Sequence, residues 1–196
     1  MSAAPWLWLL AGPNGAGKST YAPNLAAIVE EVVGPDAIAQ QLLPTAPEKA
    51  TLTAGRPAVA RKRELLRERQ SFAVETTLSG RSHLRDVQQA KSEGWNVGVI
   101  YIGLASPALA IARVRERRLA GGHDVPPQDV RRRYDRSLRN LAVACTIADL
   151  VVVLDNSGRR PMTRVLEVRR GVVLFGHERL PKWLRPTLEA LRRPPV

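Results

Sequence analysis

The stretch WLWLLAGPNGAGKST, from Trp6 to Thr20, decides the fold of this 196-residue chain. Its apolar start, Trp6 to Leu10, is typical of a buried strand in a parallel sheet. Gly12 to Ser19 match the phosphate-loop pattern G-x-x-x-x-G-K-[ST], and Lys18 to Val29 have helical composition. Glycines let backbone N–H groups converge on a phosphate, and the N-terminus of the helix adds partial positive charge. The order strand, loop, helix is the context that this motif requires.

The loop defines an expected nucleotide site. Lys18 should reach the β- and γ-phosphates of ATP and Ser19 should ligate Mg²⁺, so ATP and Mg²⁺ are the expected cofactors. Asp155, at the end of a later strand, is expected to have an adenine-loop role or simply to form a turn, and Asn156 next to it is expected to bind the nucleotide. The predicted nucleotide-binding residues are Gly12, Pro13, Asn14, Gly15, Ala16, Gly17, Lys18, Ser19, Thr20 and Asn156.

Two other classes that carry this loop fit the sequence less well. The ATPases of ABC transporters share its wording, but their L-S-G-G-Q signature is only half matched, at Leu78–Ser82, after the wrong strand. The strand before Asp155 lacks their Asp-Glu pair, and the N-K-x-D motif of switch GTPases is absent from the sequence. A small-molecule kinase is the interpretation left.

Outward from the loop, apolar strands alternate with helical patterns. This alternation predicts an α/β fold, a P-loop NTPase three-layer sandwich with a mostly parallel five-stranded sheet. The chain is expected to form a single domain, 1–196, with an Arg-rich helical lid at about 106–140 and a C-terminal hairpin and helix at about 162–192. Further strands are expected at Val32-Val33, Phe72–Val74, Trp95–Leu104 and Leu150–Leu154, the hairpin at Arg164–Phe175, and helices at Asp36–Leu43, Glu48–Gln70, Arg81–Glu93, Pro107–Ala120, Pro126–Asn140 and Leu180–Leu191.

Composition excludes several classes of protein. The chain is 44% hydrophobic and 24% charged, which excludes a disordered tail or a coiled-coil rod. Cys145 is the single cysteine, so an intramolecular disulfide and a zinc site built on clustered cysteines are excluded. No apolar run approaches a membrane span, and the run at Trp6 has no basic segment before it. A cytoplasmic protein without a membrane partner is expected.

The net charge is +12, and 25 of the 30 basic residues are arginine. Arginine suits bidentate contact with phosphate, although a genome that favours arginine codons explains the ratio equally well. The stretch from Ile111 to Arg139 holds nine arginines, on two predicted helices joined by Gly121–Val125. We expect this lid, with His123 in its hinge, to close over the transferring phosphoryl group. The candidate catalytic arginines are Arg113, Arg117, Arg132 and Arg133.

Two carboxylates follow neighbouring strands of the predicted sheet. Phosphoryl transfer to a hydroxyl needs a carboxylate that accepts the proton and aligns the oxygen. Asp36 is the expected base, and Glu75 with Thr76 should hold other hydroxyls of the acceptor. The structural alternatives are a helix N-cap for Asp36 and a solvated strand end for Glu75.

Several of these stretches together resemble the zeta-toxin family of P-loop kinases. The resemblance covers about residues 6–158, and parts of it resemble a small bacterial branch of that family, often labelled a predicted ABC-type ATPase. It rests on Gly12–Thr20, Gly34–Ala39, Phe72–Ser79, Arg113–Arg117, Gly121–Pro126, Arg131–Tyr134, Ser137–Leu141 and Asp149–Ser157.

Zeta toxins use ATP and Mg²⁺ to phosphorylate the 3′-hydroxyl of UDP-N-acetylglucosamine. The resemblance therefore implies Lys18 and Ser19 in the nucleotide site, Asp36 as base, and Glu75 with Thr76 at the sugar. Arg113 and Arg117 match the lid helix, whereas the second lid arginine of the family is replaced here by His123, Arg132 or Arg133. The resemblance also implies an antitoxin protein as partner.

Two other functions stay open at this point. The charge suggests a nucleic-acid-binding P-loop ATPase or a polynucleotide kinase, and the loop alone would also suit a nucleotide-binding regulator without transfer activity. Aromatic residues make up 5% of the chain, which is thin for base stacking, and arginines concentrate in the lid. A kinase with a small-molecule hydroxyl acceptor and no specific nucleic-acid partner is thus favoured.

Overall fold

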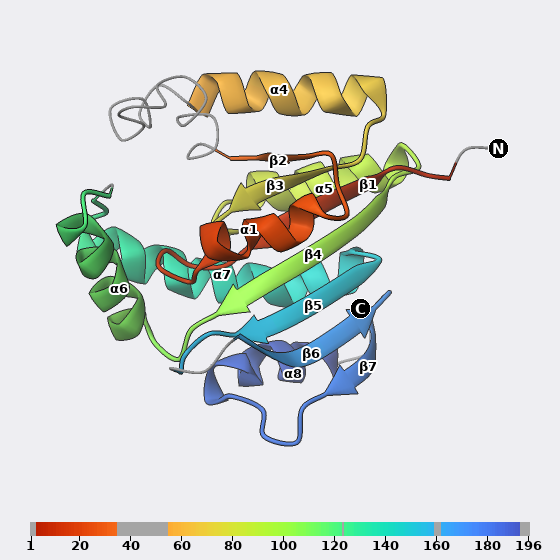
Figure 1. The fold of residues 1–196 in the computed structure, drawn as a ribbon. Helices are drawn as coiled ribbons and strands as arrows, with labels where there is room; N and C mark the ends of the chain where they lie inside the picture. The colour runs from red at the N-terminus through yellow and green to blue at the C-terminus, as the bar shows by residue number, and fades with distance from the viewer. Residues whose placement is uncertain (1–2, 35–54, 123, 159–161, 193–196) are drawn as a thin grey trace.

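The computed structural model describes residues 3–34, 55–122, 124–158 and 162–192. Strands and helices alternate along the chain as the sequence predicts (Figure 1). The elements are β1 (Trp6–Ala11), α1 (Lys18–Ala26), β2 (Glu31–Val33), α4 (Gly55–Glu68), β3 (Phe72–Thr76), α5 (Arg81–Ser92), β4 (Asn96–Gly103), α6 (Pro107–Leu119), α7 (Pro127–Ile147), β5 (Leu150–Asp155), β6 (Thr163–Arg169), β7 (Val172–Gly176), a 3₁₀ turn η1 (Lys182–Leu184) and α8 (Arg185–Leu191).

One sheet with the order β2-β3-β1-β4-β5-β6-β7 organises the molecule. The first five strands in this order are parallel to one another, and β6 runs antiparallel to both of its neighbours, β5 and β7. The predicted α/β class is confirmed, but the expected count of five strands is wrong because the C-terminal hairpin joins the sheet. It does so because β6 pairs with the open edge of β5, with Val151 opposite Val168, and buries Val165 and Leu166 there.

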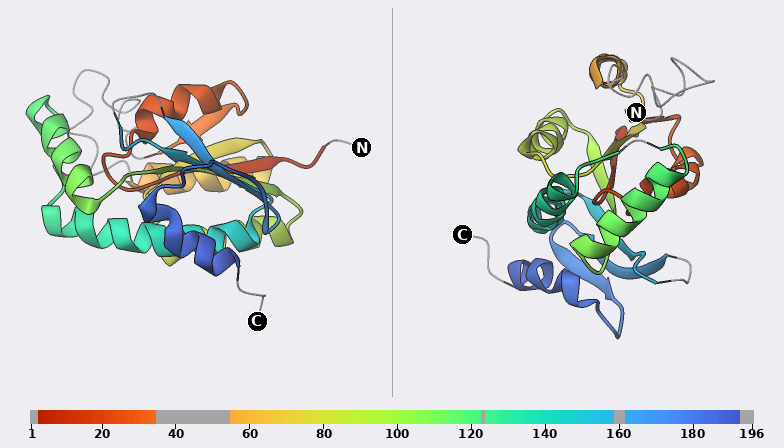
Figure 2. Two further views of the ribbon diagram at one scale, coloured as in Figure 1. Left: turned by 90° about the horizontal axis from the view of Figure 1, so that it is seen from below. Right: turned by 90° about the vertical axis from the view of Figure 1, so that its left-hand side faces the viewer.

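Helices cover both faces of the sheet, so two apolar cores form (Figure 2). Alternate residues of β1 point to opposite faces. Leu7 and Leu9 pack in the core with α5, α7 and α8, and Leu10 packs in the core with α1 and α6. Because the inner strands are buried on both sides, they appear in the sequence as continuous apolar runs.

The long helix α7 is anchored to the sheet. The sequence predicts a helix over Pro126–Asn140 that could continue towards Ala148, and a single helix runs from Pro127 to Ile147. Its buried face is fixed by two hydroxyl contacts: the Tyr134 hydroxyl donates to the Leu104 carbonyl at 2.7 Å, and the Ser137 and Tyr101 hydroxyls lie 3.0 Å apart. Only the first turns of α7 therefore reach the end of the sheet where the phosphate loop lies.

Some predicted boundaries differ. Helix α1 ends at Ala26 rather than Val29, and the last helix is divided into η1 and α8. The helix expected over Asp36–Leu43, and the first part of that expected over Glu48–Gln70, lie outside the described residues.

Helix α4 itself is tied to β2 because Arg61 contacts both carboxylate oxygens of Glu31, at 2.8 to 3.2 Å. None of the described helices has the length and apolar character that crossing a bilayer requires.

Candidate functional site

The phosphate loop lies at the carboxyl end of β1, where the strand order reverses between β3 and β4. This is the place where parallel α/β sheets bind ligands. A Cβ on Gly12 would lie 2.2 Å from the Ile102 carbonyl oxygen, so only glycine allows the loop to cross β4 this closely. Gly17 has a φ of 91° and precedes α1 without a side-chain cap. No side-chain cap therefore accepts hydrogen bonds from the first N–H groups of α1, and these groups can bind an anion instead.

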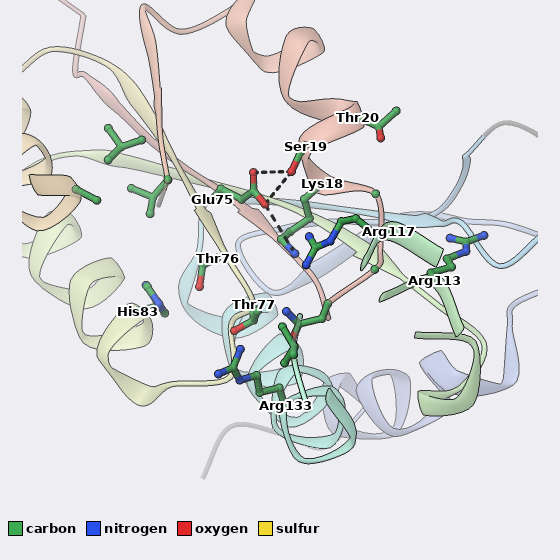
Figure 3. A pocket seen from close by; sticks show the side chains of 18 of the residues that line it. Lys18, Ser19, Thr20, Glu75, Thr76, Thr77, His83, Arg113, Arg117 and Arg133 are labelled. Atoms are coloured by element: carbon green, nitrogen blue, oxygen red, sulfur yellow. Dashed lines mark hydrogen bonds and ion pairs between the residues drawn. The ribbon is translucent and has the colours of Figure 1, made fainter. Parts of the chain in front are cut away.

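Glu75 meets the phosphate loop (Figure 3). The register of β1 and β3 sets Leu10 beside Glu75, so the carboxylate emerges next to the start of α1. Its two oxygens both lie 3.4 Å from the Ser19 hydroxyl, which donates to them, and one lies 4.0 Å from Lys18 Nζ. Lys18 is nearly buried and also donates to the carbonyls of Gly12 and Pro13, at 3.0 and 3.2 Å.

A cavity of about 630 Å³ opens over the loop. It brings together most of the residues singled out from the sequence: Asn14, Gly15, Gly17, Lys18, Ser19, Thr20, Glu75, Thr76, Arg113, Arg117 and Arg133. The predicted residues that the structure describes but that do not line it are Gly12, Pro13, Ala16, Arg132 and Asn156. Asn156 contacts the loop from behind, since its Nδ2 donates to the Ala16 carbonyl at 2.9 Å.

Neighbouring arginines on α7 have different surroundings. Arg133 lines the cavity, together with Arg113 and Arg117 of α6. Arg132 is turned about 100° around the helix from it and pairs with Asp129 at 2.7 Å on the exposed surface. The sequence analysis treated both arginines as candidates for contact with a phosphoryl group. The structure favours Arg133, because it lines the cavity and Arg132 does not.

Asp36 and His123 lie outside the described residues, so the role of each stays a prediction. The chain that leads to Asp36 leaves β2 next to Glu75, because a Cβ on Gly34 would lie 3.0 Å from the Glu75 Cβ. Thr76 is buried, and its hydroxyl oxygen accepts the Leu78 N–H at 2.9 Å.

The polar residues of the cavity wall that the sequence analysis missed include Lys62 on α4 and His83 on α5, beside Thr77 and Asp124. Lys62 and His83 are the two that lie on helices α4 and α5. Both face Asp86: Lys62 Nζ lies 2.7 Å from Asp86 Oδ2, and His83 Nδ1 lies 3.8 Å from the same oxygen. The pKa of His83 is below its usual value, because the effect of burial, which lowers it, is larger than the effect of Asp86, which raises it. The three-residue spacing of His83 and Asp86 indicates in the sequence that they share one helix face. Nothing in the sequence indicates that Lys62 of another helix lies next to them.

The oxygens present fit a magnesium ion that is shared with a nucleotide. Mg²⁺ is commonly held by one or two protein oxygens together with phosphate and water oxygens. The Ser19 hydroxyl and the Glu75 carboxylate provide such oxygens beside the loop. In the described part of the chain no group of three or more His, Cys, Asp or Glu could hold a metal without such help. The Asn14 Oδ1 is buried there without a hydrogen-bond partner, as expected where a ligand completes the contacts.

Comparison with solved structures shows the same fold. A chain of the AvrRxo1-ORF1:-ORF2 complex with ATP superimposes with a TM-score of 0.67 and 19% identity over 88% of this chain. This chain spans 60% of that one. The structure of the PezAT chromosomal toxin–antitoxin system of Streptococcus pneumoniae gives a TM-score of 0.62 and 15% identity, covering 97% of this chain and 88% of that chain.

The fold and the loop together define a P-loop α/β protein with a nucleotide-binding fold. Residues 7–141 match the model of the AAA domain family AAA_33, and the chain belongs to this family. An uncharacterized protein of Haemophilus influenzae is 35% identical over 123 residues, which cover 63% of this chain and 88% of that protein.

Proposed function

We propose that this protein is an ATP-dependent kinase that transfers the γ-phosphoryl group to a hydroxyl of a small molecule. One observation carries the proposal: the cavity that contains the phosphate loop continues past Glu75 to a second wall formed by α4 and α5. Hydrolysis requires space only for a water molecule beside the nucleotide. The additional wall supports a second substrate that binds next to the γ-phosphate.

The transfer can be assigned to residues of this chain. The acceptor oxygen forms a bond to the γ-phosphorus, the bond from that phosphorus to the bridging oxygen breaks, and ADP leaves. The acceptor proton passes to a carboxylate, for which Asp36 is the first candidate and Glu75 the second. Lys18 and the loop N–H groups hold the phosphates, while Arg113, Arg117 and Arg133 face the developing charge.

Magnesium fits this assignment at Ser19 and Glu75. When bound, Mg²⁺ would neutralise charge on the β- and γ-phosphates. The protein oxygens orient the nucleotide, and the near-burial of Lys18 strengthens its interaction with phosphate.

A nucleotide sugar such as UDP-N-acetylglucosamine is the acceptor that the resemblance to zeta toxins favours. The similarity of fold to the PezAT toxin–antitoxin structure supports the same acceptor, and it also supports an antitoxin partner. Identity in that comparison is 15%, so acceptor and partner rest on the quoted motifs rather than on the superposition.

A polynucleotide kinase is the second candidate. Exposed arginines continue from the cavity along α7, and Arg131, Arg136 and Arg139 have no ion pair among the described residues. A chain of the Pnkp1/Rnl/Hen1 RNA repair complex shares the fold, with a TM-score of 0.55, 18% identity and coverage of 72% of this chain and 46% of that chain. Salt-dependent binding, considered below, separates this candidate from the first.

The proposal is tested with γ-labelled ATP and a bacterial metabolite extract. Label should move to a hydroxyl compound, and mass analysis should identify that compound by its gain of phosphate. The Lys18→Ala variant is the control and should leave the extract unlabelled. Release of labelled phosphate from ATP without any labelled metabolite would contradict the kinase assignment.

A further inference from the structure

The α4–α5 wall of the cavity carries polar groups that the transfer chemistry does not use. Lys62 and His83 both line the cavity, and Figure 3 shows His83 on the side away from Thr20 and Arg113. Asp86 is not part of the lining but lies behind them, with its Oδ2 at 2.7 Å from Lys62 Nζ and 3.8 Å from His83 Nδ1. One carboxylate oxygen thus accepts a hydrogen bond from Lys62 of α4 and lies beside the Nδ1 edge of His83 of α5.

Both side chains have unused hydrogen-bonding capacity. An ammonium group has three donors, and Asp86 is the only hydrogen-bond partner of Lys62 Nζ within the described part of the chain. The His83 ring turns its Nδ1 edge towards Asp86, and no residue that the structure describes is hydrogen-bonded to its Nε2. Burial lowers the pKa of His83 against the opposing charge of Asp86, and Lys62 lowers it further, which favours the neutral ring. A proton on Nδ1 then leaves Nε2 as an acceptor.

The charge of this wall differs from that of the phosphate end. The charges of Lys62 and Asp86 cancel in their ion pair, and the lowered pKa of His83 favours its neutral ring, so the cluster carries little net charge. Ala58, Val59 and Val74 form the apolar surface beside it. The cations Lys18, Arg113 and Arg117 line other parts of the cavity, so they and not this wall attract anionic groups.

We propose that Lys62 and His83 bind an uncharged hydroxyl or amide group of the phosphoryl acceptor, and that Asp86 is the positioning residue for both. The inference rests on the proposed function, because it assigns one end of the acceptor of that reaction. A neighbouring donor and acceptor satisfy a hydroxyl or an amide, whereas a phosphate offers acceptors only and would leave Nε2 unpaired. The wall therefore selects acceptors by a neutral polar group beyond the reacting hydroxyl.

His83→Leu is the main variant because it leaves the Lys62–Asp86 ion pair in place. With the acceptor identified from the metabolite extract, we expect its KM to rise about tenfold, the effect of one lost hydrogen bond. The KM for ATP should stay unchanged. His83→Gln, which places a hydrogen-bonding amide at this position, should bind the acceptor more tightly than His83→Leu does. Arg85→Leu, an exposed change on the same helix, is the matched control.

Asp86→Asn tests the positioning role. The variant keeps the size of the side chain, and the ¹⁵N signals of the His83 ring in the full-length protein report its tautomer. The wild type should show a neutral ring with the proton on Nδ1, and the variant should show mixed tautomers and a raised KM for the acceptor. A wild-type ring that is protonated at pH 7, or that carries its proton on Nε2, would overturn the inference.

An anion site is the competing outcome. In protein saturated with ADP, inorganic phosphate should leave the His83 signals unchanged, and phosphate-dependent shifts would overturn the neutral assignment. If the extract yields a phosphorylated product but His83→Leu leaves the KM of its acceptor unchanged, this inference fails alone. If no product forms with any variant or with the wild type, the proposed function fails, and the acceptor role of this wall fails with it.

Discussion

Glu75 places both of its carboxylate oxygens 3.4 Å from the Ser19 hydroxyl, across 56 residues of sequence. The contact links the end of β3 to the first turn of α1, and the same carboxylate lies 4.0 Å from Lys18 Nζ. Sequence reasoning had assigned Glu75 to the acceptor. Its position beside the phosphate loop would also let the carboxylate reach a magnesium ion bound to the nucleotide. Substitution of Glu75 is therefore expected to affect the reaction differently from substitution of Asp36.

Lys18→Ala should weaken ATP binding by about 10- to 100-fold, because a hydrogen bond to a charged group contributes about 1.5–3 kcal/mol. The fold should survive, since Lys18 contacts the loop carbonyls and not an apolar core. Calorimetric titration of wild type and variant measures the change, with thermal unfolding as the control. Equal affinities would show that the loop is not the nucleotide site.

Asp36→Asn should lower transfer by about 10²- to 10⁴-fold if Asp36 accepts the acceptor proton. Asn and Asp cap helices about equally well, so the stability should change little, whereas Asp36→Ala would cost about 1 kcal/mol if the residue is a cap. Activity that persists in Asp36→Asn but is lost in Glu75→Gln would move the base to Glu75.

Glu75→Gln should lower transfer most at limiting Mg²⁺, and excess Mg²⁺ should restore part of it, because the carboxylate lies beside Ser19. Initial rates over a magnesium titration measure this. A loss that magnesium leaves unaltered would place Glu75 with the acceptor instead. Full activity in both carboxylate variants would rule out a carboxylate base at either position.

Arg133→Ala should lower kcat strongly, while Arg132→Ala should leave it near the wild-type value. The two residues are adjacent, but only Arg133 lines the cavity, and Arg132 forms an exposed pair with Asp129. Exposed pairs contribute about 0–1 kcal/mol to stability, so Arg132→Ala is a matched control. Steady-state kinetics with saturating ATP compare them, and equal losses would argue against the assignment by geometry.

Binding to nucleic acid should be weak, about micromolar or worse near physiological salt, if the arginines serve phosphoryl transfer. Fluorescence anisotropy with single-stranded RNA and duplex DNA of several lengths, measured over a range of salt concentrations, provides the test. Nanomolar binding that depends on length would instead favour the polynucleotide kinase.

Asp149→Asn should destabilise the protein at pH 7 by about 1.5–3 kcal/mol, the range for hydrogen bonds to charged groups. Burial alone would raise the pKa of Asp149, but Lys91 at 2.7 Å, the Val97 N–H at 2.9 Å and Arg170 at 3.5 Å outweigh it, and the pKa is lowered. The stabilisation is thus present above the unfolded-state pKa, near 4, and is lost as the pH falls through the folded-state value. Urea unfolding from pH 7 to pH 3 should show the two proteins converging, and a constant difference would contradict this.

Local sequence was sufficient for the elements and for the phosphate loop. Each depends on neighbours within a few residues: an apolar run forms a strand, Gly17 permits a positive φ, and Arg170-Gly171 turn the C-terminal hairpin. The hairpin was predicted correctly for this reason. Its attachment to β5 was not, because nothing within Thr163–Gly176 specifies which strand edge it will pair with.

The sequence by itself determined that the chain carries a phosphate loop on a parallel α/β sheet, with carboxylates and arginines suited to phosphoryl transfer. Only the tertiary structure decided which of them meet. Strand register brought Glu75 to Ser19, helix rotation separated Arg133 from Arg132, and the packing of α4 beside α5 brought Lys62 to Asp86 and His83. Such contacts join segments that are distant in the chain, and they depend on strand order and side-chain packing, which local patterns do not encode.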